Sequence, residues 1–150
     1  MTQEEIDQVL EAHRGWVETE LARQLPRLGL ERLTVSEADG RRAARELVGM
    51  IVDDEAAALS VSFRRVEIRD QRTRWGSCSA RGTLSFNWRL VLAPFEVLDY
   101  VVVHELCHLR APNHSPRFWQ LVGSRRPQWR LHREWLRDFG PELLAFRPEP

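Results

Sequence analysis

Apolar residues recur at helical intervals in the first third of the chain. The stretch from Thr2 to Pro26 has apolar positions three or four residues apart, and Thr2 and Glu5 have the spacing of a capping box. This pattern predicts an amphipathic helix with a structural role. Residues 26–40 contain one proline and two glycines and are expected to form a connection. A second amphipathic helix is expected over residues 44–55.

The spacing of the apolar residues changes from helical to alternating at about residue 61. Residues 61–69 alternate apolar and charged side chains, as a half-buried strand does. A second strand is predicted over residues 83–89, after a turn at Gly82, with Ser85, Asn87 and Arg89 on its polar face. The small residues between these strands can bring the backbone close to another element.

Helical patterns return in the last third of the chain. Pro94 is expected to open a helix that runs to about Arg110 and is apolar on nearly every side, as a helix through the middle of a core is. Ser115 and the proline after it predict the start of another helix. A last helix is expected from about Pro127 to the Gly140-Pro141 pair, which predicts its end.

Composition limits the class of protein. With 150 residues, 43% of them hydrophobic and 29% charged, the chain is expected to fold as a single domain, 1–150, rather than to be disordered. Its apolar runs are too short to span a bilayer, and its start lacks the basic and apolar parts of a signal peptide. We therefore expect a cytoplasmic protein that does not bind membranes. The 2 cysteines are too few for a disulfide scaffold.

The formal net charge of zero hides an uneven distribution of charge. Acidic residues predominate in the first 20 positions, and arginine predominates over residues 110–137. All 22 basic residues are arginine, so catalysis through a lysine Schiff base is excluded. Arginine-rich surfaces can bind phosphates or carboxylates.

Candidate chemistry lies in the apolar helix, where residues 104–108 match the H-E-x-x-H pattern. His104 and His108 are one helical turn apart, so both imidazoles can reach one ion, while Glu105 is rotated by about 100° and can reach a bound water. A catalytic zinc normally has three protein ligands and one open position. His114, just past the helix-breaking Pro112, is the candidate third ligand.

Each of these residues also has a purely structural interpretation. The two helix histidines could be hydrogen-bonded core residues, but two imidazoles on an apolar helix are costly to bury without partners, which favours metal binding. For Cys107, one position before His108 and facing away from it, we expect packing. We also expect structural roles for Cys78 and for His132.

Four stretches of the chain together resemble the YgjP-like metallopeptidase domain, also described as the DUF45 family, which is related to SprT-like and M48-type zincins. They are residues 74–79, 84–90, 99–109 and 113–119. The resemblance covers about residues 60–140, which would form the catalytic core, with residues 1–40 as an N-terminal helical extension. It implies an α+β, gluzincin-like fold, in which a short twisted sheet packs against a central H-E-x-x-H helix with further helices at both ends.

The resemblance also implies a chemistry. The expected enzyme is a metallopeptidase with one Zn²⁺ per chain, held by His104, His108 and His114, and with Glu105 as the catalytic base. The zinc would activate a water that hydrolyses the peptide bond, and Glu105 would move its proton to the leaving amine. Candidates to stabilise the oxyanion are the side chains of Tyr100, Asn87, Arg89 and His132.

Substrate contacts are expected from the strand at residues 83–89. Its edge could accept an extended peptide as a further strand, which would place Asn87 and Arg89 among the substrate-binding residues. The alternative is that its polar face is simply solvated.

Two other functions stay open at this point. A zinc site could hydrolyse a different bond, such as a nucleotide phosphoanhydride, with arginines holding the phosphates. Alternatively, zinc could stabilise a nucleic-acid-associated module, although the absence of net positive charge argues against this. The expected partner is therefore a peptide or protein substrate, and nucleic acid is not implied. The sequence indicates no oligomeric state.

Overall fold

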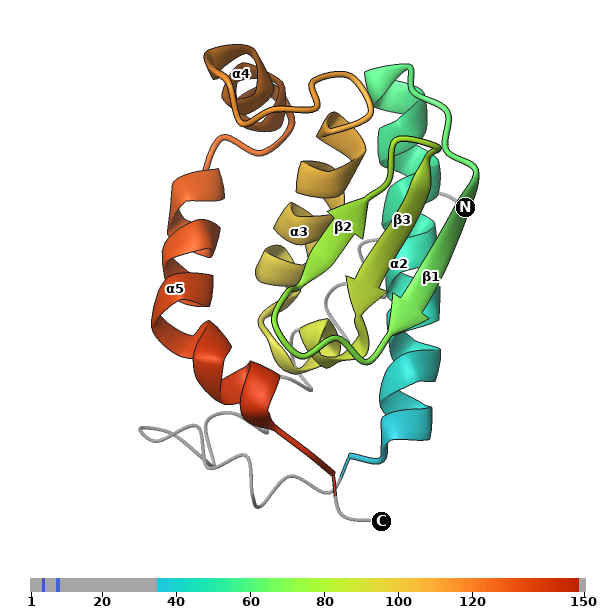
Figure 1. Cartoon of the computed structure of the whole chain (residues 1–150), viewed down its shortest axis with the longest axis vertical. Helices are drawn as coiled ribbons and strands as arrows, with labels where there is room; N and C mark the ends of the chain where they lie inside the picture. The colour runs from blue at the N-terminus through green and yellow to red at the C-terminus, as the bar shows by residue number, and fades with distance from the viewer. Residues whose placement is uncertain (1–3, 5–7, 9–34, 149–150) are drawn as a thin grey trace.

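A computed structural model describes residues 4, 8 and 35–148 of the chain. The described part is a mixed α+β structure with four α-helices, one 3-10 helix and a three-stranded sheet (Figure 1). In chain order the elements are α2 (Glu37–Leu59), β1 (Arg65–Arg69), β2 (Gly76–Cys78), β3 (Thr83–Asn87), η2 (Trp88–Leu92), α3 (Phe95–Cys107), α4 (Pro116–Arg125) and α5 (Trp129–Ala145). The helix predicted between Thr2 and Pro26 lies outside the described residues.

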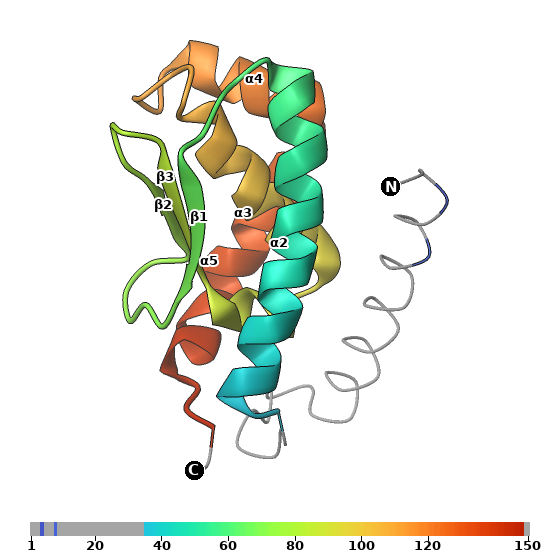
Figure 2. The same cartoon turned by 90° about the vertical axis from the view of Figure 1, so that its right-hand side faces the viewer.

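The sheet has the strand order β1-β3-β2, with β1 parallel and β2 antiparallel to β3. One face of the sheet packs on α2 and α3, so the molecule has a sheet layer and a helical layer (Figure 2). The helix α5 lies on the other side of α3 from α2 (Figure 1). Because β3 is the central strand, both of its edges are paired. The expectation that residues 83–89 offer a free edge is therefore wrong, and the edge strand beside α3 is β2.

The helix α2 begins earlier than the sequence pattern predicts. Ser36 caps it by accepting a hydrogen bond from the backbone N–H of Asp39. Gly40, expected in a connection, lies in its first turns against the indole of Trp88, where an added Cβ would be 2.4 Å from a ring carbon. The close packing against Trp88 explains why a glycine is found inside this helix.

Both predicted strands are shorter in the structure than the alternating pattern suggests. The first covers Arg65–Arg69 and does not include residues 61–64. The second ends at Asn87, and the chain then turns into η2. The Asn87 side chain accepts a hydrogen bond from the Arg89 backbone N–H, which caps the new helix. Trp88 and Leu90, which follow this strand, are fully buried and lie in the 3-10 helix.

The helix α3 runs through the core, as its apolar sequence predicts. Val102, Val103 and Leu106 are fully buried, and Cys107 is buried among them. Apolar side chains of α2, β3 and η2 surround this helix. The helix that carries the candidate metal ligands is therefore anchored by the core over its whole length.

The last helix, α5, does not stop at Gly140-Pro141 but continues to Ala145. Gly140 packs against the indole of Trp75, and Leu143 in the extra turn is fully buried. Burial of this leucine stabilises the extra turn by about 2 kcal/mol, which offsets much of the cost of about 3 kcal/mol for a proline inside a helix. None of the helices in the described ranges combines the length and the hydrophobicity that a membrane span requires.

Candidate metal centre

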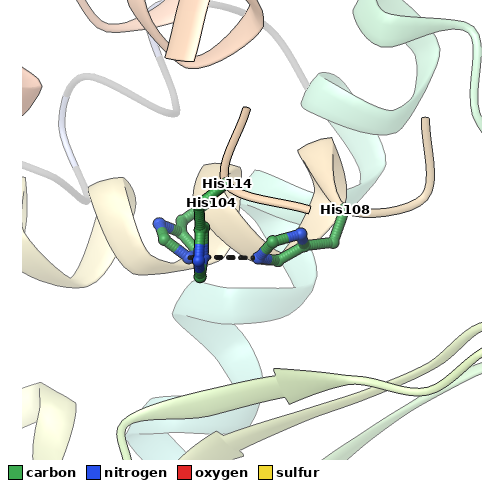
Figure 3. Close-up of side chains that lie close together, drawn as sticks. All are labelled: His104, His108 and His114. Atoms are coloured by element: carbon green, nitrogen blue, oxygen red, sulfur yellow. Dashed lines mark hydrogen bonds between the residues drawn. The ribbon is translucent and has the colours of Figure 1, made fainter. Parts of the chain in front are cut away.

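Three histidines from two segments of the chain meet at the end of α3. His104 lies in the last turn of this helix, and His108 is its C-cap residue. The chain then passes Pro112 and returns, so that His114 precedes α4 and faces both rings (Figure 3). The Nε2 atom of His114 is 3.0 Å from that of His108 and 3.2 Å from that of His104. The sequence prediction that these three residues come together is confirmed.

The spacing of these nitrogen atoms fits a shared metal ion. Three imidazoles that bind one tetrahedral Zn²⁺ at about 2.0–2.1 Å have nitrogens about 3.3 Å apart. In this cluster, three potential ligand atoms lie within 4.8 Å of one another. A hydrogen bond between two ring nitrogens requires that one of them carries a proton and the other does not. Three ring nitrogens that face one point therefore cannot all be paired with one another by hydrogen bonds. A cation at the point on which they converge satisfies all three.

Hydrogen bonds on the far side of the rings orient two of the three histidines. The Nδ1 of His108 lies 3.1 Å from the carbonyl oxygen of Ala111, which can only accept, so this nitrogen carries the proton. Its Nε2 then presents a lone pair to the cluster. The Nδ1 of His104 lies 3.2 Å from the hydroxyl of Tyr100, one turn earlier on α3. Such outer contacts hold metal-ligating imidazoles in the required tautomer and orientation.

Aromatic side chains of α4 support the histidine cluster. Phe118 is fully buried and stacks on His108, with ring centroids 4.4 Å apart. It also meets the rings of His104 and His114 edge-on, at 4.9 Å and 5.0 Å. Trp119 stacks on His114 from another side, at 5.8 Å. Phe118 lies in the stretch 113–119 that carries the family resemblance, and its position four residues after His114 is the sequence signal for this contact.

The electrostatics of the site favour the neutral form of two imidazoles, those of His104 and His108. Burial lowers the pKa of His104 to about 3, and the neighbouring His108, His114 and Arg133 contribute in the same direction. Burial also lowers the pKa of His108. A neutral imidazole is the form that binds a metal, since the protonated ring has no free lone pair.

Glu105 lies next to the cluster on the side of the sheet. Its side chain is buried against β2, where a Cβ added to Gly76 would be 3.0 Å from the Glu105 Cγ. Burial raises the pKa of Glu105 to about 7, and the charge of Arg74 only partly opposes this. A carboxyl group with a pKa near neutrality can both accept and return a proton at physiological pH.

The strand next to Glu105 has an open edge. Asn87 donates its backbone N–H to the Trp75 carbonyl, and Ser79 donates its own to Thr83. Since hydrogen-bonded pairs alternate along an antiparallel ladder, Ser77 faces β3, whereas Gly76 and Cys78 direct their N–H and C=O groups outward. Within the described ranges, no strand pairs with this edge.

Asn87 and Arg89, predicted to bind substrate, do not reach the histidine cluster. Both are fully buried. Asn87 Nδ2 donates to the carbonyl oxygens of Gln71 and Arg74, and Arg89 donates to Asp70 and to the carbonyl of Phe146. Their polar face is neither beside the candidate metal site nor solvated. The loop between β1 and β2 covers this face. The buried carbonyl groups of the loop need hydrogen-bond donors, and the side chains of Asn87 and Arg89 supply them.

The remaining candidates lie around the cluster without joining it. The ring centroid of His132 is 6.3 Å from that of Tyr100, outside the group of three histidines. Burial raises the pKa of Cys78 to about 11, and that of Cys107 to about 12. Both thiols therefore stay protonated at neutral pH and are poor nucleophiles.

Comparison with protein families agrees with this geometry. A model described as "YgjP-like, metallopeptidase domain" matches residues 30–139, well over half of the chain. The chain belongs to the YgjP-like metallopeptidase family. The resemblance seen in the sequence is thus confirmed, and the match includes α2 in addition to the stretches that carry the motifs. Comparisons with curated proteins and with solved structures found no match.

Membership in the YgjP-like family indicates a metal-dependent hydrolase. Together with the three-histidine cluster, it also indicates that the site holds a metal, with zinc as the ion that such a ligand set favours.

Proposed function

We propose that the protein is a zinc-dependent metallopeptidase, a small zincin-like domain that hydrolyses peptide bonds. One observation carries this proposal: the Nε2 atoms of His104, His108 and His114 converge on one point, and Glu105 follows His104 in the same helix. Three protein ligands leave a fourth position open, as in a catalytic rather than a structural zinc site.

Different residues of the chain would carry out different parts of the hydrolysis. When bound, Zn²⁺ would supply a Lewis acid and would lower the pKa of a coordinated water toward about 7. The three histidines would hold the ion, and Tyr100 would hold the ring of His104 through its Nδ1. Glu105 would take a proton from the attacking water and deliver it to the leaving amine nitrogen, which completes the addition of water across the amide bond.

The open edge of β2 favours a peptide over other substrates. An extended peptide could pair with the outward N–H and C=O groups of Gly76 and Cys78 as a fourth strand. The Glu105 side chain packs directly against Gly76, so a peptide on this edge would lie close to the proposed base. A nucleotide has no backbone that uses such an edge.

Zinc analysis and hydrolysis of an unfolded protein substrate test this proposal together. The wild-type protein should hold one zinc per chain and cleave the substrate. Glu105→Gln should keep the zinc and lose cleavage, by about 100-fold or more if Glu105 is the general base. His108→Ala should lose both, whereas the neighbouring His132→Ala should keep the zinc.

Two results would contradict the proposal. Wild-type protein without bound transition metal would exclude the metal site. Cleavage of nucleoside triphosphates, without cleavage of any unfolded protein, would assign the site to phosphoanhydride hydrolysis instead.

A further inference from the structure

A pocket of about 410 Å³ lies on α5, beside the aromatic residues that support the histidine cluster. We call it the α5 pocket; it is lined by Trp129, Arg130, Arg133, Glu134 and Arg137. Three of its five residues are arginines, against one glutamate. The pocket is therefore basic, although the whole chain has no net charge.

The α5 pocket is connected to the candidate metal centre through one tryptophan. The guanidinium of Arg133 lies 5.1 Å from the centre of the Trp119 ring. Trp119 in turn stacks on His114 and lies 5.7 Å from the ring of His104. The charge of Arg133 also acts on His104. A substrate side chain bound in this pocket would therefore lie within a few residues of the scissile bond, if that bond is held at the three histidines.

Two arginines of the pocket are held in place without an anionic partner among the described residues. Arg130 lies over the Trp129 ring, 4.5 Å from its centre, as Arg133 lies over Trp119. In the part of the chain that the structure describes, neither guanidinium forms an ion pair, whereas Arg137 pairs with Asp138. A guanidinium that rests on an indole keeps its N–H edge free, and its limited motion lowers the entropy cost of binding an oxyanion.

The stacking of Trp119 and Trp129 favours a compact anion over a single-stranded nucleic acid as the ligand of the pocket. Trp119 and Trp129 stack on each other with centroids 4.3 Å apart. His114 and Arg133 also lie against Trp119, and Arg130 lies against Trp129. Single-stranded nucleic acids bind through bases stacked on open aromatic faces. Here those faces are already used, which favours a compact anion that needs only the guanidinium edges.

We propose that the α5 pocket binds the carboxylate of an aspartate or glutamate side chain in the substrate. This proposal rests on the peptidase function proposed above, because it makes the pocket a specificity subsite of that reaction. An acidic side chain near the scissile bond would reach Arg130 and Arg133, while Glu134 would disfavour groups that carry several negative charges.

Peptide binding tests the subsite without requiring turnover. The probes are fluorescent octapeptides of otherwise uncharged residues that carry one glutamate at each position in turn, paired with versions that carry glutamine there. Binding is measured by anisotropy with zinc-loaded Glu105→Gln protein. At one or more positions, the glutamate peptide should bind at least about 10-fold more tightly than its glutamine pair, as expected for charge-assisted hydrogen bonds.

Arginine variants locate the effect. Arg133→Gln and Arg130→Gln should each remove most of the preference for glutamate. Both side chains are exposed, so these variants should fold normally. Arg42→Gln, which removes an exposed arginine of α2, is the matched control and should keep the preference.

The outcomes separate this proposal from the peptidase proposal. Equal binding of glutamate and glutamine peptides at every position, or an unchanged preference in Arg133→Gln, would overturn the subsite. Displacement of the peptide by ATP at lower concentrations than by the unlabelled glutamate peptide would show a phosphate site and overturn it as well. Glutamate-selective binding without any hydrolysis by the wild type would support the pocket and contradict the peptidase function. Hydrolysis by the wild type without glutamate-selective binding would support the peptidase function and contradict the subsite.

Discussion

Gly76 brings the edge strand β2 into contact with the proposed catalytic carboxylate. A Cβ at this position would lie 3.0 Å from the Glu105 Cγ, 3.3 Å from its Oε2 and 3.2 Å from the carbonyl oxygen of Ser85. One of these neighbours is main chain and cannot move easily, so a larger residue would displace the Glu105 side chain. The absence of a side chain at Gly76 is thus a condition for the position of Glu105.

Gly76→Val should lower kcat by about 100-fold, because a misplacement of the base by about 1 Å is enough for such a loss. Bound zinc should not change, since the atoms nearest to the added side chain belong to Glu105 and Ser85 and not to the three histidines. Kinetics with a cleaved peptide and metal analysis of the same preparation check both expectations.

Gly49→Ala is the matched control for Gly76→Val. A Cβ at Gly49 meets nothing within 4 Å, so this variant should keep full activity and gain up to about 1 kcal/mol of helix stability. Normal kcat in Gly76→Val would show that Glu105 does not depend on this contact.

At the scale of elements, an ion-pair network links α2, α3 and the end of α4. Glu55 of α2 accepts hydrogen bonds from Arg125 at 2.7 Å and 3.1 Å and from Arg126 at 3.1 Å. Both carboxylate oxygens of Asp99, in α3, also accept hydrogen bonds from Arg126. The network holds α4, which carries Phe118 and Trp119, against the helix of the histidines.

Glu55→Gln should lower the free energy of unfolding at pH 7 by about 2 kcal/mol, the range for hydrogen bonds to a buried charge. The cost should be smaller than for a fully buried pair, because the Arg125 side chain is 37% exposed. Urea unfolding of both proteins measures this difference. Glu46→Gln, at an exposed position of the same helix, is the control and should change stability by less than about 0.5 kcal/mol.

The contribution of Glu55 should depend on pH. Burial alone would raise its pKa, but the hydrogen bond from Arg125 and the charge of Arg126 outweigh burial and lower the pKa below its ordinary value of 4.5. A lowered pKa stabilises the folded state fully above about pH 4.5, and this contribution is lost as the pH falls through the folded-state pKa. The difference between wild type and Glu55→Gln should therefore shrink below pH 4.5. A constant difference down to pH 3 would contradict this account.

At the scale of the whole molecule, the metal site and the hydrophobic core are separate sources of stability. The core of α2, α3, β3 and η2 is buried without any contribution from the histidines. The ion would connect the end of α3 with the segment before α4. Metal should therefore add stability to a fold that forms without it.

Removal of zinc by a chelator should lower the unfolding midpoint but leave the far-UV circular dichroism at room temperature unchanged. Zinc in thousandfold excess over its Kd adds about 4 kcal/mol to the free energy of unfolding. The His108→Ala protein should show no response to the chelator, which makes it the control. Loss of helical signal in the metal-free wild type would show instead that folding requires the metal.

Local patterns were sufficient to predict most of the helices and the candidate ligands. The four-residue spacing of His104 and His108 follows from the pitch of any helix, and Pro112 predicts the turn that returns His114 to them. Ser115 and Pro116 likewise predicted the start of α4, which the structure confirms. These features depend on neighbours in the chain, so the sequence alone contains them.

Only the tertiary structure decided the features that depend on contacts between distant residues. The alternating pattern predicts Arg89 on a solvent-facing or substrate-facing strand, but its side chain is buried and donates a hydrogen bond to the carbonyl of Phe146, 57 positions away. The helix α5 passes Gly140-Pro141 because a distant Trp75 and a buried Leu143 stabilise the extra turn. Strand order also depends on long-range pairing, which placed β2 rather than β3 at the edge beside Glu105. The physical reason is that burial and partner choice are properties of the packed chain, whereas helix pitch and capping are properties of the local one.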